Sequence, residues 1–421
     1  MFDFSEKTKQ INQRDQSVYN LHTNHPLQIN SQNYFNYKKY VSIHSEDRDI
    51  NKYPLASSFE IELPEPLLNV AQVTLTNWSF PVNYSTFTVN NNNITMTFQI
   101  NQPYNPGAHN YFNPLQEKVF EALFNHINQD FVIQIEEGFY NPIQMTTELT
   151  NKFNEAVTIY ISNYFLDKNY VTELDQFRSA NGYQKFVIVY NTVKQNIWYG
   201  NICDGFVLTN ETQLIANNLN ANILCTNKGQ LPDFSSWGLP SNLGLPRNNV
   251  DSISIEGYIP RFYYGDVNPG DNGFWLLIDT SLPGSSVYYI QSPYKINLMG
   301  NSYIYVEIAG LNCIDETVPY NLSKFTETTN ETNGIVNSAF AKIALPATPI
   351  SQIYDRDSLP YKLFLPPAER IKKLSIKIRY HNGQLVNFDT FNYSFLLEFT
   401  ILLPAPNKSY TIQSYNSTSK L

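Results

Sequence analysis

One stretch near the C-terminus, residues 371–403, constrains the fold of this chain more than any other. Its first half alternates strictly between apolar and polar side chains. The apolar positions are Leu374, Ile376, Ile378 and Tyr380, and the polar positions are Lys373, Ser375, Lys377 and Arg379. Because successive side chains of a β-strand point to opposite faces, this pattern predicts a strand with one apolar face and one wetted, cationic face.

A turn and a second apolar row follow this strand. The tripeptide His381-Asn382-Gly383 favours a reversal, since Asn and Gly accept the positive φ of a tight hairpin turn. Residues 385–388 begin the return, and the second row ends at Pro404 because proline cannot donate to a sheet ladder. The members of this row are Phe395, Leu397, Phe399 and Ile401. The two rows predict a β-hairpin, and a hairpin with so apolar a face needs a second layer to cover it.

Strand patterns of the same kind recur along most of the chain. The predicted strands cover residues 40–44, 59–63, 70–78, 87–89, 94–98, 131–135, 186–190, 197–199, 206–208, 274–279, 287–290, 303–308, 340–345 and 361–365. Pro64 is expected to end the second of these strands, and the polar run Asn90–Asn93 is expected to be the loop of a hairpin. We therefore predict a mainly β fold, an antiparallel β-sandwich of the jelly-roll-like kind.

Two helices are predicted between the strands. Asn113-Pro114 is typical of a helix start, and apolar residues recur at helical spacing over residues 115–127. Asn141-Pro142 repeats this start, with Gln144 placed to complete a capping box. The second helix carries a broad apolar stripe between residues 149 and 164, which predicts core packing rather than a cofactor site.

Composition divides the chain into five parts. These are an extended N-terminal arm at residues 1–36, a β-rich domain with inserted helices at 37–210, a connection at 211–260, a C-terminal β-sandwich domain at 261–408 and a tail at 409–421. The arm shows no sustained hydrophobic period, and the connection is rich in Asn and Pro. A chain of 421 residues has room for two such β domains. Residues 321–338 are expected to form an exposed loop.

Net charge and the absence of targeting signals narrow the function. The net charge of -9 and the pI of about 5.2 argue against a sequence-independent grip on nucleic acid. The first residues lack the basic and apolar regions of a secretory signal, and no apolar run reaches the ~18 residues of a membrane helix. We expect a chain without a transmembrane segment that is made in a cytosol.

The uncharged polar surface is expected to meet other protein surfaces. Charged residues make up only 15% of the chain, whereas it contains 30 Tyr and 27 Phe. Tyrosine is enriched at interfaces and in strands alike. The codon usage of an AT-rich genome explains the same composition equally well, so both explanations stay open.

The sequence contains no nucleophile elbow, P-loop, GxGxxG or HExxH motif. We therefore predict a protein that is not an enzyme, with no catalytic, cofactor-binding or metal-binding residues. Cys203, Cys225 and Cys313 are widely spaced and odd in number, which favours reduced, buried thiols over disulfides or a zinc site. His22 and His25 are expected to be solvated side chains.

Two loops and the tryptophans allow alternative interpretations. The three carboxylates of residues 46–49 could bind Ca²⁺, but a solvated turn held partly by Arg48 is favoured. The run Asp266–Gly273 is similar to a calcium loop, but Leu277 stands where the closing Glu is required, so a β-turn is predicted. A sugar platform would need exposed tryptophans, whereas most lie in or beside predicted strands and are expected to be buried. The four are Trp78, Trp198, Trp237 and Trp275.

The order of these pieces resembles that of minor capsid and penton-like proteins of nucleocytoplasmic large DNA viruses. The opening block consists of Ser45-Glu46-Asp47-Arg48-Asp49, Tyr53-Pro54, Phe59-Glu60-Ile61-Glu62-Leu63-Pro64, Asn69-Val70 and Pro81. The second block is Ile135-Glu136-Glu137-Gly138-Phe139-Tyr140, a helix, Phe186-Val187-Ile188-Val189-Tyr190, Phe206-Val207-Leu208 and Leu243-Gly244-Leu245. The closing block is Ile371-Lys372-Lys373-Leu374 to Gly383, Val386-Asn387-Phe388 and Phe395-Leu396-Leu397-Glu398.

The resemblance implies a non-enzymatic structural protein of a large icosahedral virus particle, located in the virion capsid. It implies a minor capsid (cement) component that joins neighbouring capsid subunits through loops, arm and strand edges. The implied partners are the major capsid protein and other minor capsid proteins, without direct nucleic acid contact, and self-association stays open. The alternatives are a vertex (penton) protein and a surface carbohydrate- or receptor-binding β-sandwich. The basic face Lys372–Arg379 is then a solvated strand or a contact to an acidic capsid neighbour.

Overall fold

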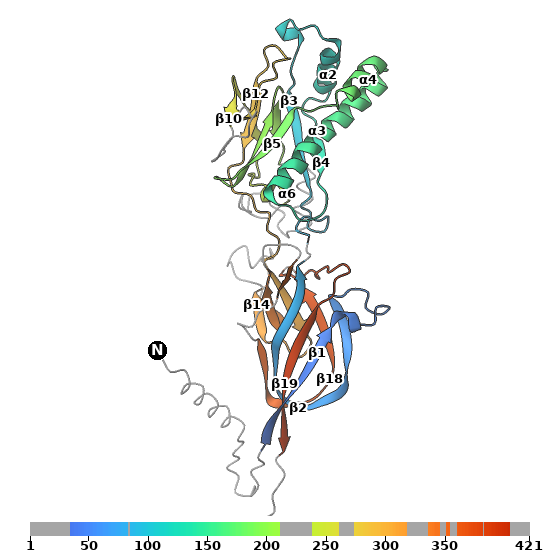
Figure 1. Cartoon of the computed structure of the whole chain (residues 1–421), viewed down its shortest axis with the longest axis vertical. Helices are drawn as coiled ribbons and strands as arrows, with labels where there is room; N and C mark the ends of the chain where they lie inside the picture. The colour runs from blue at the N-terminus through green and yellow to red at the C-terminus, as the bar shows by residue number, and fades with distance from the viewer. Residues whose placement is uncertain are drawn as a thin grey trace, which may run out of the picture. The chain divides into compact units, whose positions relative to one another are not determined.

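The computed structural model describes residues 34–82, 85–210, 238–260, 273–317, 336–345, 351–353, 360–381 and 383–404. The chain forms two compact units (Figure 1). The terminal unit contains the described residues before 83, those of 303–317 and those after 335. The central unit contains the described residues from 85 to 302. The mainly antiparallel β-sandwich fold predicted from the sequence is confirmed.

The terminal unit is built on one seven-stranded sheet of the described residues, with the order β1-β19-β2-β18-β13-β16 and with β17 paired to β2. Its strands are β1 (Tyr34–His44), β2 (Ser58–Val82), β13 (Tyr303–Ile308), β16 (Ala341–Ala344), β17 (Ser351–Ile353), β18 (Tyr361–Arg379) and β19 (Ser394–Pro404). A separate two-stranded sheet joins β14 (Ile314–Thr317) to β15 (Val336–Ala339). All of these pairs are antiparallel.

The predicted hairpin of the two C-terminal apolar rows is only partly correct. The turn forms, because Tyr380 N donates to Gln384 O at 2.8 Å and Gly383 adopts a φ of +85°. The second row then leaves the first, since β19 pairs with β1 and β2 while β18 pairs with β2 and β13. Strand β2, from the other end of the chain, therefore lies between the two predicted hairpin partners.

Strand β2 is 25 residues long and continues through the proline that was expected to end it. Pro64 and Pro66 fall in a gap of the β2–β18 ladder, between the pairs formed by Glu62 and by Leu67. A bulge leaves backbone groups outside the ladder, so it tolerates a residue that has no N–H, and it bends the strand. The bulges let one continuous strand turn around the core, which a regular strand of this length could not do.

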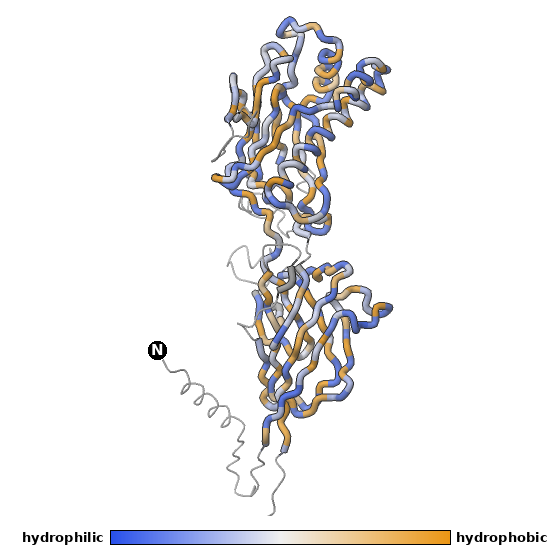
Figure 2. Tube along the Cα trace, in the orientation of Figure 1, coloured by the Kyte–Doolittle hydropathy of each residue, from blue (hydrophilic) through white to orange (hydrophobic). Residues whose placement is uncertain are grey.

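The inner face of the curled sheet forms one hydrophobic core. Every position of the two predicted apolar rows except the half-buried Tyr380 is buried. Strands β1, β2, β13, β16, β18 and β19 all contribute residues to this core. Figure 2 shows the corresponding alternation of hydrophobic and hydrophilic residues along the long strands.

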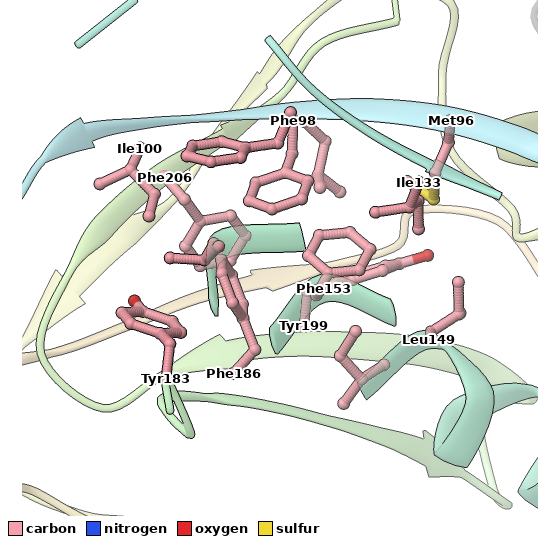
Figure 3. Packing of buried hydrophobic residues seen from close by; sticks show 14 of the residues in the cluster. Met96, Phe98, Ile100, Ile133, Leu149, Phe153, Tyr183, Phe186, Tyr199 and Phe206 are labelled. Carbon is pink, nitrogen blue, oxygen red and sulfur yellow. The ribbon is translucent and has the colours of Figure 1, made fainter. Parts of the chain in front are cut away.

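The central unit is a sandwich of two four-stranded sheets, β4-β3-β7-β8 and β5-β6-β12-β9. The strands are β3 (Thr95–Gln102), β4 (Phe131–Gln134), β5 (Phe186–Asn191), β6 (Asn196–Asn201), β7 (Gly205–Leu208), β8 (Val250–Asp251), β9 (Ile253–Ile255) and β12 (Val287–Gln291), with a pair β10 (Ile259–Pro260) and β11 (Phe274–Leu276). Aromatic rings fill the space between the sheets, with Phe98 stacked on Phe153 at 4.3 Å and edge-on to Phe186 at 5.2 Å (Figure 3). Such pairs add to the hydrophobic stabilisation of the core.

Both predicted helix starts are confirmed. Asn113 caps α2 (Pro114–Asn125), and Asn141 and Gln144 form the capping box of α3 (Pro142–Asp167). Two further helices, α4 (Val171–Ser179) and the short α6 (Leu239–Asn242), had no sequence prediction. The expected hairpin around Asn90–Asn93 is wrong, because Phe87 pairs with Gly138 instead of with β3.

Helix α3 closes the outer edge of β5 with its own polar side chains. Asn154 donates to Phe186 O and accepts from Phe186 N, both at 2.9 Å. One turn earlier, Thr150 Oγ1 accepts from Ile188 N at 3.1 Å, and Thr158 does the same for Tyr183 N at 2.9 Å. Residues four apart lie on one helix face, so Thr150 and Asn154 take the place of a neighbouring strand along β5, and Thr158 continues this row to Tyr183 before the strand begins.

The predicted domain boundaries do not follow the strand pairing. Residues 37–210 were expected in one domain and 261–408 in another, but β1 and β2 pair with β18 and β19, while β11 and β12 belong to the central unit. Long-range pairing cannot be read from composition along the chain. Of the predicted arm, Tyr34–Asn36 belong to β1, and the rest of the arm and the whole tail lie outside the described residues.

We expect Asn154→Ala to destabilise the central unit by roughly 2–4 kcal/mol, because a buried donor and a buried acceptor of Phe186 lose their partner. Asn151→Ala, on the exposed face of the same helix, is the matched control and should cost less than ~1 kcal/mol. Urea unfolding and amide hydrogen exchange at Phe186 measure the effect. Equal losses in the two variants would show that α3 does not protect this edge.

Candidate interaction surface

The strand β1 forms one open edge of the main sheet. It pairs with β19 from Tyr34 opposite Pro404 to His44 opposite Ser394, and no other described strand pairs with it. Because β2 pairs with β19 only up to Ile401, the last residues of β19 and their partners in β1 form a two-stranded ribbon beyond β2 (Figure 1). An edge strand presents backbone N–H and C=O groups to any further strand.

Aromatic side chains on both faces of this edge are exposed. The exposed fractions are 47% for Phe35, 40% for Tyr37 and 54% for Tyr40. Phe35 and Tyr37 share the parity of the buried Ile43, whereas Tyr40 lies on the opposite face. Large aromatic side chains contribute strongly to interfaces when they become buried there, so this edge is the candidate interaction surface.

The two lysines of the edge are paired within the chain. Lys38 Nζ lies 2.7 Å from Glu398 Oε1, and Lys39 Nζ lies 2.9 Å from Glu65 Oε2. The pKa of the Glu398 carboxyl is lowered. Partial burial opposes this change, but the hydrogen bonds from Lys38 and from the hydroxyl of Tyr40 have the larger effect. The edge therefore carries few unpaired charges at neutral pH.

A buried ion network lies at the other side of the sheet, and it corrects one sequence prediction. Arg379, expected on the wetted face of its strand, is 5% exposed. Its guanidinium donates to Glu307 and, at 2.7 Å, to Glu316 Oε2, and it lies 5.0 Å from the ring centre of Tyr305. His381 Nδ1 also contacts Glu316. The pKa of Glu316 is lowered overall, because the bonds to Arg379 and His381 have a larger effect than burial, which alone would raise it.

A second buried polar cluster, in the central unit, has no signal in the sequence. Asp204 accepts hydrogen bonds from Tyr183 Oη and from Tyr104 N, both at 2.6 Å. Asn201 donates to Tyr183 Oη at 2.8 Å, and its Oδ1 accepts from Asp204 N at 2.9 Å. Burial raises the pKa of Asp204, although these bonds oppose the rise. The cluster ties three loops together, which explains its polar residues without any catalytic role.

The sequence-predicted loop at residues 46–49 is a hydrogen-bonded turn. Arg48 donates to the carbonyls of Ser45 at 2.6 Å and of Tyr53 at 3.1 Å. Asp49 Oδ1 accepts from Asn51 N at 3.0 Å, as in an Asx turn. The expected role of Arg48 in holding this turn is confirmed. Among the described residues, no group of three metal-ligating side chains comes together.

Tryptophans predicted to be buried are buried. The exposed fractions of Trp78, Trp198 and Trp275 are 5%, 3% and 6%, and Trp237 lies outside the described residues. Trp275 packs on the backbone of Gly200, where a Cβ would come within 2.6 Å of the indole ring. The three described tryptophans therefore cannot form a sugar platform.

The structure also shows where the predicted cysteines and the lysines of β18 lie. Cys203 is buried, but Cys313 is exposed, because it lies in the loop between β13 and β14, and this corrects the expectation of buried thiols. Lys372 and Lys373 are exposed and lie 3.9 and 3.2 Å from Glu62 and Glu60. The positions outside the described residues are Cys225, His22, His25 and residues 266–272.

A groove of about 410 Å³ lies beside the first turns of α3 and contains three glutamates. Glu137 accepts from Val89 N at 2.7 Å, and Glu148 accepts from Glu136 N at 3.3 Å. These two carboxylates therefore hold the loop before the helix, which gives the groove a structural explanation. Within the described part of the chain, no helix is long and apolar enough to cross a membrane.

No protein-family model matches the chain, and no curated protein matches its sequence. The structure is similar to that of the mavirus penton protein, with 9% sequence identity and a TM-score of 0.37 over 88% of this chain and 100% of the other. It is also similar to a chain of the Sputnik virophage structure, with 12% identity and a TM-score of 0.37 over 87% and 98%. At these values the likeness does not assign a family or a function.

We expect Arg379→Met to destabilise the terminal unit by ~3–5 kcal/mol, because it leaves the buried Glu316 without its cation. Lys373→Met removes an exposed ion pair of the same strand and should cost at most ~1 kcal/mol. Urea unfolding of both variants tests this difference. A small loss for Arg379→Met would show that Glu316 does not depend on the guanidinium.

Acidification should weaken the same network. The folded-state pKa of Glu316 is lowered, so its contribution is present above the ordinary glutamate pKa and is lost as pH falls through the folded value. The free energy of unfolding of the wild type should therefore fall more steeply below about pH 5 than that of Glu316→Gln. Parallel slopes in urea titrations between pH 7 and pH 3 would contradict the lowered pKa.

Proposed function

We propose that this chain is a non-enzymatic structural protein of a large icosahedral virus particle, a minor capsid (cement) component. It would join neighbouring capsid subunits, the major capsid protein and other minor capsid proteins among them. The observation that carries the proposal is the open edge of β1 with its exposed Phe35, Tyr37 and Tyr40. An edge of this kind takes an added strand from a partner, while side chains on its faces select that partner.

The sequence supports the viral part of this proposal. The three blocks that resemble minor capsid and penton-like proteins lie on structured elements. The first block falls in β2 and the loop before it, the second in the central sandwich, and the third in β18, its turn and β19. The resemblance therefore rests on the parts of the chain that build the two units. A vertex position fits the same observations and stays the alternative.

The described tryptophans give the carbohydrate-binding alternative no support. It requires exposed tryptophans beside Asn and Asp on loops, and the three described tryptophans are packed in the two units. We therefore place assembly ahead of glycan recognition.

Mass spectrometry of purified virions after detergent stripping tests the proposal. We expect this chain to remain with the shell at a constant ratio to the major capsid protein, because it would be held by the same kind of protein contacts. Loss of the chain with the stripped fraction, or its absence from particles, would rule out a capsid role.

Deletion of the N-terminal segment gives a further expectation. Because Tyr34–Asn36 are part of β1, the deletion has to end at Asn33 instead of Asn36. The chain lacking residues 1–33 should fold with an unchanged melting temperature and enter particles less efficiently than the full chain, since a terminal arm can order on contact with a partner. Normal incorporation would exclude the arm from assembly.

A further inference from the structure

We propose that His381 is a proton-dependent clamp in the terminal unit. Its charged ring holds β14 against the end of β18, and its neutral ring holds β14 less tightly. The clamp is part of the ion network around Arg379, and histidine is the side chain whose charge ordinarily changes between pH 5 and pH 8. This device lies within one unit of the chain, so it does not depend on the proposed capsid role.

The four side chains of the network form a row in which acidic and basic groups alternate. Glu307 of β13 accepts from Arg379 Nε, and Arg379 Nη2 donates to Glu316 Oε2 at 2.7 Å. The other oxygen of this carboxylate, Oε1, contacts His381 Nδ1. Within the row, two carboxylates therefore stand against one permanent cation. A proton on His381 brings the row to two charges of each sign.

Burial differs along the row in the way that a proton-dependent contact requires. The side chains of Glu316 and Arg379 are 5% and 6% exposed, whereas that of His381 is 49% exposed. Solvent protons therefore reach the histidine ring without any opening of the fold. The carboxylate that the ring contacts is buried, and a charge beside a buried carboxylate has a larger effect than the same charge at an exposed pair.

The other titratable or charged side chains near the row come from all four neighbouring strands. They are Tyr303 and Tyr305 on β13, Asp315 on β14, Lys342 on β16 and Lys377 on β18. The ring of Tyr305 lies 6.2 Å from that of His381, and Lys342 lies 3.9 Å from the ring centre of Tyr303. Asp315 and Lys377 are exposed. Tyrosine, aspartate and lysine ordinarily keep one charge state between pH 6 and pH 8, so the histidine carries the change.

The contact ties two separate sheets together. The described part of β14 pairs only with β15, whereas Arg379 and the strand β18 belong to the main sheet. Glu316 is the side chain of β14 that reaches across to the end of β18. Loss of charge on His381 should therefore loosen β14 and β15 locally, while the ladder between β1 and β19 on the other side of the main sheet stays unchanged.

The direction of the pH effect follows from the charges. Burial would raise the pKa of Glu316, but the bonds to Arg379 and His381 lower it, so this carboxyl is ionised throughout the range from pH 6 to pH 8. A neutral histidine ring donates from Nδ1 in one tautomer only, and a hydrogen bond between two charged groups is stronger. The hold on β14 is therefore greater at pH 6 than at pH 8. Further acidification weakens it again once Glu316 takes up a proton.

Amide hydrogen exchange in the full-length chain at pH 6 and pH 8, corrected for the intrinsic exchange rates, tests the clamp. In the wild type we expect the amides of β14 and β15 to be roughly fivefold more protected at pH 6, because a partly exposed charge pair has an effect of this order. The amides that join β1 to β19 serve as the internal reference and should change less than about twofold. Equal protection of β14 and β15 at the two pH values would overturn the proposal.

Three variants assign the pH response to its two partners. His381→Gln, which is neutral at both pH values, should remain at the wild-type protection of pH 8, and His381→Lys, which is charged at both, should remain near that of pH 6. Glu316→Gln removes the buried carboxylate and should abolish the response as well. A response of wild-type size in any of the three would overturn the clamp, because another group or another contact would then produce it.

His44→Gln is the matched control. His44 of β1 also lies near a glutamate, with Nδ1 4.0 Å from Glu46 Oε1, but the two side chains are 43% and 62% exposed. Because this pair is in solvent and far from β14 in the sheet order, the variant should keep the full response of the wild type. Loss of the response in His44→Gln would show that a different histidine senses the pH, and the proposal would be wrong.

Discussion

The pairing of β2 with strands from the far end of the chain is the constraint on which the terminal unit depends. β2 lies between β18 and β19, and these three strands supply most of the buried residues of this core. More than 200 residues of the central unit are therefore inserted between strands of one sheet. Contacts between residues so distant in sequence are slow to form, because the loop must close before any burial rewards it. The terminal unit cannot be complete until both ends of the chain have met.

The sequence predicts the strands well because burial on one face leaves a period of two. The rows around Ile376 and Phe399 are buried as expected, and the caps at Asn113 and Asn141 begin their helices. This alternation identifies the buried face of a strand, but it does not identify the neighbouring strand in the sheet. Two adjacent strands with a good turn at Gly383 therefore suggested a hairpin, while the real neighbour, β2, is about 300 residues away.

The polar parts of the structure were less predictable, for a related reason. Arg379 follows the alternation of a solvated face, yet two glutamates from β13 and β14 make its burial tolerable. Nothing in the sequence around Asn154 or Asp204 marks either residue as buried, because their hydrogen-bond partners are brought close only by the fold. The strand of the candidate interaction surface was predicted only from residue 40 onward, because its first residues are exposed on both faces. A ribbon with aromatic residues on both parities shows no period, so residues 34–36 were assigned to an arm.

The two edges of this chain that the structure describes most fully are treated in opposite ways. At β5, two helix side chains, Thr150 and the buried Asn154, satisfy outward backbone groups of the strand, and Thr158 bonds to Tyr183 just before it. Burying a polar side chain in a core costs free energy unless its bonds are made, so this protection is specific. At β1, no described element takes the corresponding position, and the lysines that could repel a further strand are paired internally. Helix side chains cover the edge of β5, whereas no described element covers the longer and aromatic edge of β1, and a partner that binds at β1 explains this difference.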